Sequence, residues 1–153
     1  MHILHLVPDL SRTLAEAVRC VRPGGMFIAC HTRPERNAIQ EAEVEVHELI
    51  VKLLGRAPRR RSNVNAEQAL REALGPGAKV EQMTLATWTE TQTGRHEVDE
   101  LANRVHSATW EIPDDVLAVA VPRAAEIYER RCGSLDREFE TAMQMVAIVV
   151  RAT

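Results

Sequence analysis

The sequence predicts a single α/β domain over residues 1–153, with a partly parallel sheet and a helical insert. Two observations support this class. The chain opens with an apolar run, an amphipathic segment, a Pro-Gly-Gly turn and a second apolar run, which is the order of a β-α-β unit. Neither apolar run alternates with polar residues, as expected of strands that helices cover on both faces.

The elements of this opening unit follow from local residue patterns. Residues 2–7 (HILHLV) are too short for a helix and predict a strand, which a Pro-Asp turn ends. Apolar side chains then recur at three- and four-residue spacing, which predicts a helix over 10–21 with Asp9 or Ser11 as its N-cap. The following proline stops the helix, two glycines allow a tight reversal, and residues 26–30 (MFIAC) predict the second strand.

The rest of the chain carries four helical patterns and two strand patterns. Residues 34–54 place apolar side chains on one helical face, and Gly55 is a residue typical of helix ends. Asn65 and Gln68 resemble a capping box that opens a short helix ending at a Gly-Pro-Gly turn. The other predicted elements are a strand over 79–91, helices over 95–106 and 114–131, and a last strand over 139–153.

Composition and charge exclude several classes of protein. A formal net charge of −3 provides no field that attracts nucleic acid or anionic lipid, so we expect the Arg-rich segment 56–61 to be a solvated loop. The three cysteines are odd in number and form no C-x-x-C pair, which favours a reducing cytoplasm. No signal peptide pattern precedes the first apolar run, and no apolar run approaches the ~20 residues of a membrane span. We therefore expect a cytoplasmic protein with no membrane or nucleic-acid partner.

Histidines and acids also occur close together, without forming a metal-binding motif. His47 lies among glutamates, and His96 has Glu100 one helical turn away. Neither group matches a recognised ligand set, and solvated helix faces explain both. We expect no metal.

Three consecutive segments of the first thirty residues resemble class I S-adenosylmethionine-dependent methyltransferases of the broad type 11 group. MHILHLVPDL resembles the end of the family's fourth strand, TLAEAVRCVRPGG the helix and turn that follow, and MFIAC the fifth strand. The later part is similar in architecture only, with a helical insert and then a hairpin-like pair of strands. The resemblance implies a partial Rossmann-like sheet, corresponding to the fourth to seventh of the family's seven strands, with a helical insert over about residues 34–76 and 95–131.

The resemblance also implies S-adenosyl-L-methionine as cofactor, although the family's main cofactor-binding segments precede the fourth strand. These segments are a Gly-rich loop after the first strand and a ribose-binding acid after the second. The seven glycines of this sequence form no G-x-G-x-x-G pattern. Because methyl transfer depends on holding donor and acceptor in line, we expect the chain alone to bind the donor poorly. It is then truncated, or it needs a partner to complete the cofactor site.

The resemblance places cofactor-binding residues at the end of the fourth strand, where ligands bind in open α/β sheets. Leu4, His5 and Leu6 occupy this position. His5 matches the first histidine of a pair in the family, and Leu6 stands at the second position. His5, and His2 outside the pair, are candidate catalytic bases because imidazole titrates near neutral pH. A histidine packed at a strand end is the alternative interpretation.

The end of the fifth strand provides the candidate substrate residues His31, Thr32 and Arg33. The acceptor is expected to be a small molecule that the sequence does not identify. The alternative to an enzyme is a non-catalytic remnant or interaction subunit that retains half of the fold. A fourth strand without its neighbour would leave an uncovered apolar edge, so we expect a homo-oligomer or a complementing chain at this strand-four edge.

Overall fold

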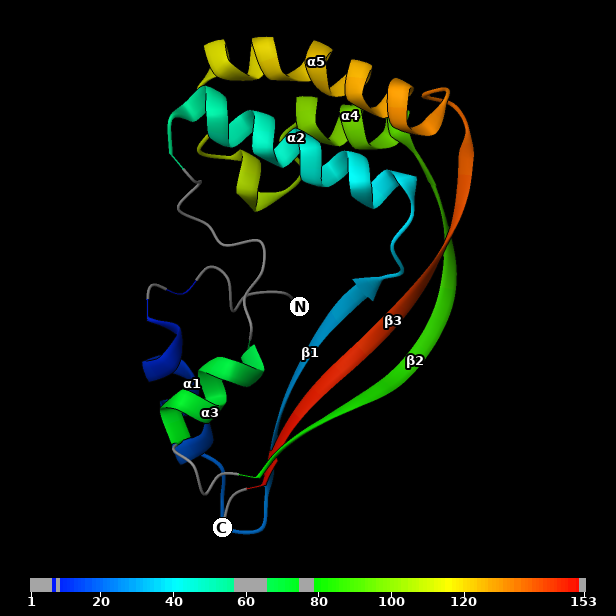
Figure 1. Ribbon diagram of the computed structural model, residues 1–153. Helices are drawn as coiled ribbons and strands as arrows, with labels where there is room; N and C mark the ends of the chain where they lie inside the picture. Colours follow the sequence, from blue (N-terminus) through cyan, green and yellow to red (C-terminus); the bar gives the residue numbers. More distant parts are fainter. Residues whose placement is uncertain (1–6, 8, 57–65, 75–78, 152–153) are drawn as a thin grey trace. The chain divides into compact units, whose positions relative to one another are not determined.

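The computed structural model describes residues 7, 9–56, 66–74 and 79–151, which form helices and a three-stranded antiparallel sheet (Figure 1). The strand order is β1-β3-β2, so the last strand in sequence pairs with both of the others. The predicted mixed α/β class is confirmed at this level. The predicted strand over 2–7, and with it the parallel β-α-β pair, lies outside the described residues. The elements in chain order are α1 (Leu10–Arg19), β1 (Met26–Pro34), α2 (Ala38–Leu54), α3 (Ala66–Leu74), β2 (Val80–Thr93), α4 (Gly94–Ala102), the 3₁₀ helix η2 (Ser107–Thr109), α5 (Asp114–Cys132) and β3 (Glu138–Arg151).

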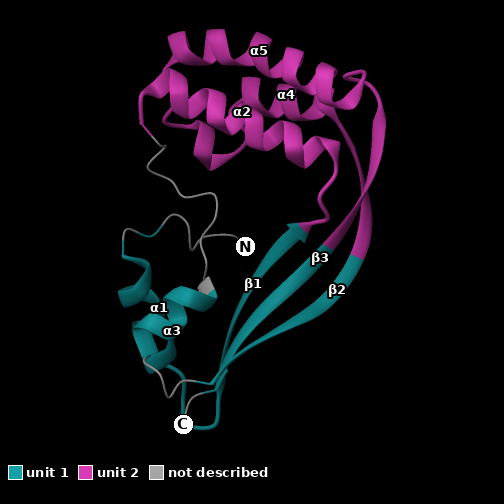
Figure 2. Cartoon of the chain, in the orientation of Figure 1, with its two compact units in different colours: residues 1–33, 61–87, 144–153 teal, residues 34–60, 88–143 magenta. Residues whose placement is uncertain are grey.

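The chain divides into two compact units, which Figure 2 shows in different colours. Unit 1 comprises residues 1–33, 61–87 and 144–153. In it, α1 and α3 pack against each other, and their apolar side chains share a core with one face of the sheet. The buried members of this core are Leu14, Ala69, Leu70, Val80, Ile148 and Val150.

Unit 2 comprises residues 34–60 and 88–143. The helices α2 and α4 both pack against α5, and the sequence periodicity that predicted these helices supplies the apolar faces that meet. Their shared core has these buried members: Ile39, Ala42, Val46, Ile50, Leu101, Ile112, Leu117, Ala120, Ala124, Tyr128 and Cys132.

Local chemistry fixes the helix ends. The Asp9 side chain accepts a hydrogen bond from the Arg12 backbone N–H at 2.9 Å, which confirms Asp9 as the N-cap of α1. Gly55 and Gly133 end α2 and α5 in the left-handed conformation, with φ of 66° and 81°. The predicted cap Asn65 lies outside the described residues.

The Pro-Gly-Gly turn between α1 and β1 requires both of its glycines. Gly24 has a φ of 76°, which side chains rarely adopt. A Cβ atom on Gly25 would lie 2.6 Å from Val21 Cγ1 and 2.9 Å from the Arg22 carbonyl oxygen. The Gly25 N–H donates to that same oxygen at 2.8 Å, which closes the turn.

The structure differs from the sequence prediction in four places. The helix predicted over 95–106 ends at Ala102. The strand predicted over 26–30 continues to Pro34, so α2 begins at Ala38 rather than at residue 34. The helix α3, predicted as part of the helical insert, instead packs with α1 in unit 1. Met26 and Ile28 of β1 are 50% and 51% exposed, so the apolar run is not buried on both faces.

Candidate functional site

The predicted substrate residues lie in the last part of β1 rather than after it. Side chains alternate along a strand, so His31 and Arg33 lie on the same face as Phe27, which packs against the core of unit 1. His31 is half-buried, whereas Thr32 and Arg33 are exposed. The three therefore lie within the last part of the strand and not in a loop after it. The other predicted site residues lie outside the described part of the chain: His2, Leu4, His5 and Leu6.

A second group of ionisable side chains gathers on α4 in unit 2. The two carboxylate oxygens of Glu100 each contact a histidine. Glu100 Oε2 lies 2.7 Å from His106 Nε2, and Oε1 lies 3.3 Å from His96 Nε2. The sequence pattern indicated the pairing of His96 with Glu100, but His106 reaches Glu100 only because the chain turns back after α4.

Glu97 is the most perturbed carboxyl of this group. Burial raises the pKa of Glu97, and the nearby carboxylates of Glu100 and Glu43 raise it further, against a smaller opposing effect of the two histidines. The phenol of Tyr128 on α5 is 3% exposed. Burial, followed by the charges of Glu97 and Glu43, also raises the pKa of Tyr128. The phenol therefore stays protonated at neutral pH.

Gly94, at the start of α4, makes this arrangement possible. A Cβ atom at Gly94 would lie 3.0 Å from Tyr128 Cβ and 3.4 Å from Leu135 Cδ2. The absence of a side chain lets α4 and α5 approach closely and places Tyr128 near Glu97. Sequence reasoning missed Glu97, because the only local signal was a glycine next to a predicted helix start, which also fits a turn.

The chemistry open to this cluster is proton transfer. Burial and neighbouring carboxylates raise the pKa of Glu97, and carboxyl groups whose pKa is raised in this way are over-represented at functional sites. Over the residues that the structure describes, no three histidine, cysteine or acidic side chains are placed to hold a metal ion.

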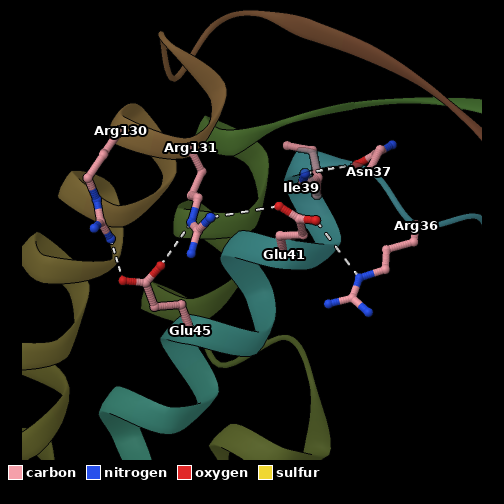
Figure 3. A network of polar contacts seen from close by, with 7 residues as sticks. All are labelled: Arg36, Asn37, Ile39, Glu41, Glu45, Arg130 and Arg131. Atoms are coloured by element: carbon pink, nitrogen blue, oxygen red, sulfur yellow. Dashed lines mark hydrogen bonds and ion pairs between the residues drawn. The ribbon is translucent and has the colours of Figure 1, made fainter.

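The exposed surface of α2 and α5 carries a network of ion pairs (Figure 3). Glu45 accepts hydrogen bonds from Arg130 and, at 3.0 Å, from Arg131 Nε. These hydrogen bonds lower the pKa of Glu45. Arg131 also lies 3.8 Å from Glu41, which lies 4.0 Å from Arg36. The network borders an open polar hollow whose cations are already paired, so we assign it to stabilisation of the surface.

A buried polar network joins the start of α2 to both long strands within unit 2. Thr141 of β3 is 1% exposed. Its hydroxyl accepts from Asn37 Nδ2 at 2.8 Å and donates to Gln92 Oε1 at 2.7 Å. Gln92 Oε1 also accepts from Gln40 Nε2 at 3.0 Å, and Asn37 Oδ1 caps α2 by accepting from the Ile39 N–H. The network holds the segment that follows β1 in a fixed conformation.

A scan against protein-family models finds no match to this sequence, and a search of curated proteins finds none either. Separately, none of the described helices has both the length and the apolarity needed to cross a bilayer.

Proposed function

We propose that this chain is the C-terminal portion of an S-adenosylmethionine-dependent methyltransferase that acts on a small-molecule acceptor. The observation that carries the proposal is the continuous set of segments over residues 1–30, including the R-P-G-G turn, in the order and spacing of the family. The described structure supports it in two respects. The turn before β1 requires both of its glycines, Gly24 for its positive φ and Gly25 for lack of space, and the last two strands in sequence are antiparallel neighbours in the sheet.

The described residues do not by themselves fit the methyl donor. Gly24 lies in the turn between α1 and β1, Gly55 and Gly133 end helices, and neighbouring atoms of the chain occupy the space beside Gly25 and Gly94. Nucleotide cofactors approach the backbone between a strand and the helix that follows it. Among these glycines, Gly94 holds such a position, directly after β2 and at the start of α4, but Tyr128 and Leu135 occupy the space beside it. We therefore propose that another polypeptide segment completes the cofactor site, and we derive no chemical step through the donor.

The helices of unit 2 are proposed as the acceptor side. Within this unit, Glu97 is the group best suited to accept a proton from an acceptor hydroxyl or amine, because burial and neighbouring carboxylates raise its pKa. The adjacent Tyr128 phenol remains a hydrogen-bond donor. His31, Thr32 and Arg33 of β1 remain proposed substrate residues, as a separate proposal within unit 1.

Calorimetric titration with S-adenosylhomocysteine tests the proposal. The purified chain should show no binding in the micromolar range. The complementing polypeptide is sought directly upstream or nearby in the genome, as one that carries a strand followed by a Gly-rich loop. A mixture of the two chains should show micromolar binding that neither chain shows alone.

Two results would contradict this proposal. Micromolar binding by a verified monomer of this chain would show that the cofactor site needs no second segment. An equally weak signal from the mixture and from each component would remove the support for a methyltransferase.

The second candidate is a non-catalytic interaction subunit that retains half of the fold. It is favoured by the apolar side chains that remain half-exposed on the sheet of unit 1, namely Met26, Ile28, Met83 and Leu85. A complementing chain that binds tightly, without creating affinity for S-adenosylhomocysteine, would favour this candidate over the enzyme.

A further inference from the structure

The strand β2 is an edge strand without the features that usually protect an edge. Within the described sheet it pairs with β3 on one side only. Residues 81–87 are all exposed. Natural edge strands are commonly protected by lysine, proline or a charged side chain that points inward. Residues 81–87 (EQMTLAT) contain no lysine, arginine or proline, and Glu81 is their one charged residue.

The other edge of the described sheet, at β1, is less suited to pairing with an identical strand. β1 ends in Arg33 and Pro34, and proline has no N–H to donate. The resemblance also assigns the neighbouring position to the predicted strand over 2–7. Of the two edges of the described sheet, β2 is therefore better suited to pair with an identical strand of a second copy.

The face that carries the apolar residues of β2 follows from alternation along the strand. Val80 is buried in the core of unit 1, so Met83 and Leu85 point to the opposite face. They are 42% and 51% exposed. The open edge begins after Val80, because Arg71 Nη2 already donates to the Val80 carbonyl oxygen at 2.9 Å.

We propose that residues 81–87 of β2 pair antiparallel with the same residues of a second copy of this chain, about a two-fold axis at Thr84. In this register Met83 lies opposite Leu85 of the second copy, Gln82 opposite Ala86, and Glu81 opposite Thr87. The two large apolar side chains, Met83 and Leu85, therefore meet each other, two threonines meet on the axis, and no two like charges face each other. The two sheets join into one continuous sheet.

Neighbouring registers are less favourable. An axis at Met83 places Glu81 opposite Leu85, which buries a carboxylate against an apolar side chain. An axis at Leu85 places Met83 opposite the hydroxyl of Thr87. Only the axis at Thr84 pairs both apolar residues with each other, so the side-chain order selects the register as well as the partner.

The oligomeric state in solution tests the proposal, and two variants distinguish pairing at the β2 edge from stacking of the exposed sheet faces. Sedimentation equilibrium should show a dimer of the full chain. Leu85→Arg should weaken the dimer by at least about tenfold, because the substitution acts twice across the two-fold axis. The matched control is Ile28→Arg, since Ile28 is also 51% exposed and lies on the same face but on β1. This control should leave the dimer intact.

Cysteine cross-linking tests the register directly. In a background with Cys20 and Cys30 replaced by serine, Thr84→Cys should form a disulfide-linked dimer. Opposed residues of antiparallel strands have Cα atoms about 4.5–5.5 Å apart, which suits a disulfide. Thr87→Cys should not cross-link, because the two copies of this residue would lie about 20 Å apart.

Four results would overturn the proposal. They are a monomer at every concentration tested, a dimer that survives Leu85→Arg, equal weakening by Leu85→Arg and Ile28→Arg, and equal cross-linking at positions 84 and 87. A dimer that survives Leu85→Arg would indicate pairing at another edge, such as the strand-four edge. Equal weakening by Leu85→Arg and Ile28→Arg would indicate stacking of sheet faces. None of these measurements depends on methyl transfer.

Discussion

Replacing Thr141 with valine tests how much the buried polar network stabilises unit 2. The substitution keeps the shape of the side chain but removes the hydroxyl that accepts from Asn37 and donates to Gln92. Gln92 Oε1 retains its hydrogen bond from Gln40, whereas Asn37 Nδ2 loses the contact at Thr141. One polar group left unsatisfied at a buried site costs about 1–3 kcal/mol, so we expect a loss of about 2 kcal/mol in the free energy of unfolding. For a chain of this length the Tm should fall by about 4–8 °C.

Urea and thermal unfolding followed by far-UV circular dichroism measure this effect. Thr141→Ser keeps the hydroxyl and loses only a buried methyl group, so it should cost about 1 kcal/mol and rank between the wild-type protein and Thr141→Val. The matched control is Thr89→Val at an exposed position of β2, which should change stability by less than about 0.5 kcal/mol. A Thr141→Val variant as stable as the wild-type protein, or more stable than Thr141→Ser, would show that packing rather than hydrogen bonding governs this site.

Two further substitutions test the α4 cluster and the turn before β1. Because burial raises the pKa of Glu97 above its ordinary value of 4.5, the folded protein binds more protons than the unfolded chain as the pH rises past that value, and the free energy of unfolding falls through this window. Glu97→Gln removes this loss of stability. The free energy of unfolding of the variant, relative to that of the wild-type protein, should therefore increase from pH 4.5 toward neutral pH, as measured by urea unfolding at several pH values. A difference in stability that is independent of pH would refute the raised pKa of Glu97. Gly25→Ala should lower the free energy of unfolding by about 1–3 kcal/mol, since the new Cβ would lie 2.9 Å from a backbone oxygen that closes the turn. An unchanged Tm in calorimetry would contradict the steric requirement.

The helices and strands were predictable because their signals are local. Leu10 to Arg19 and Asp114 to Cys132 follow apolar spacing, and Gly55 and Gly133 end helices through a backbone conformation that only local sequence decides. The α/β class followed from the same patterns. The end of β1 was less predictable, since nothing in its polar residues 31–34 distinguishes a strand from the loop that precedes α2.

The candidate site depended on contacts between distant parts of the sequence. Glu97 and Tyr128 belong to different helices, and only the close packing at Gly94 brings them together. Thr141 is one of several threonines along the two long strands, and its burial follows from its place in the central strand. The half-exposed face of the sheet was also missed, because an apolar run indicates a strand without stating which of its faces another element covers.

The central position of β3 has a consequence for how this chain folds. β3, the strand that pairs with both β1 and β2, is synthesised after them and begins more than a hundred residues after the start of β1. During synthesis both strands therefore emerge before β3 can pair with them, while the helices, whose internal hydrogen bonds are local in sequence, can form first. Closing such long loops is slow, and exposed strands aggregate in the interval. We expect production of this protein to respond strongly to temperature and chaperones.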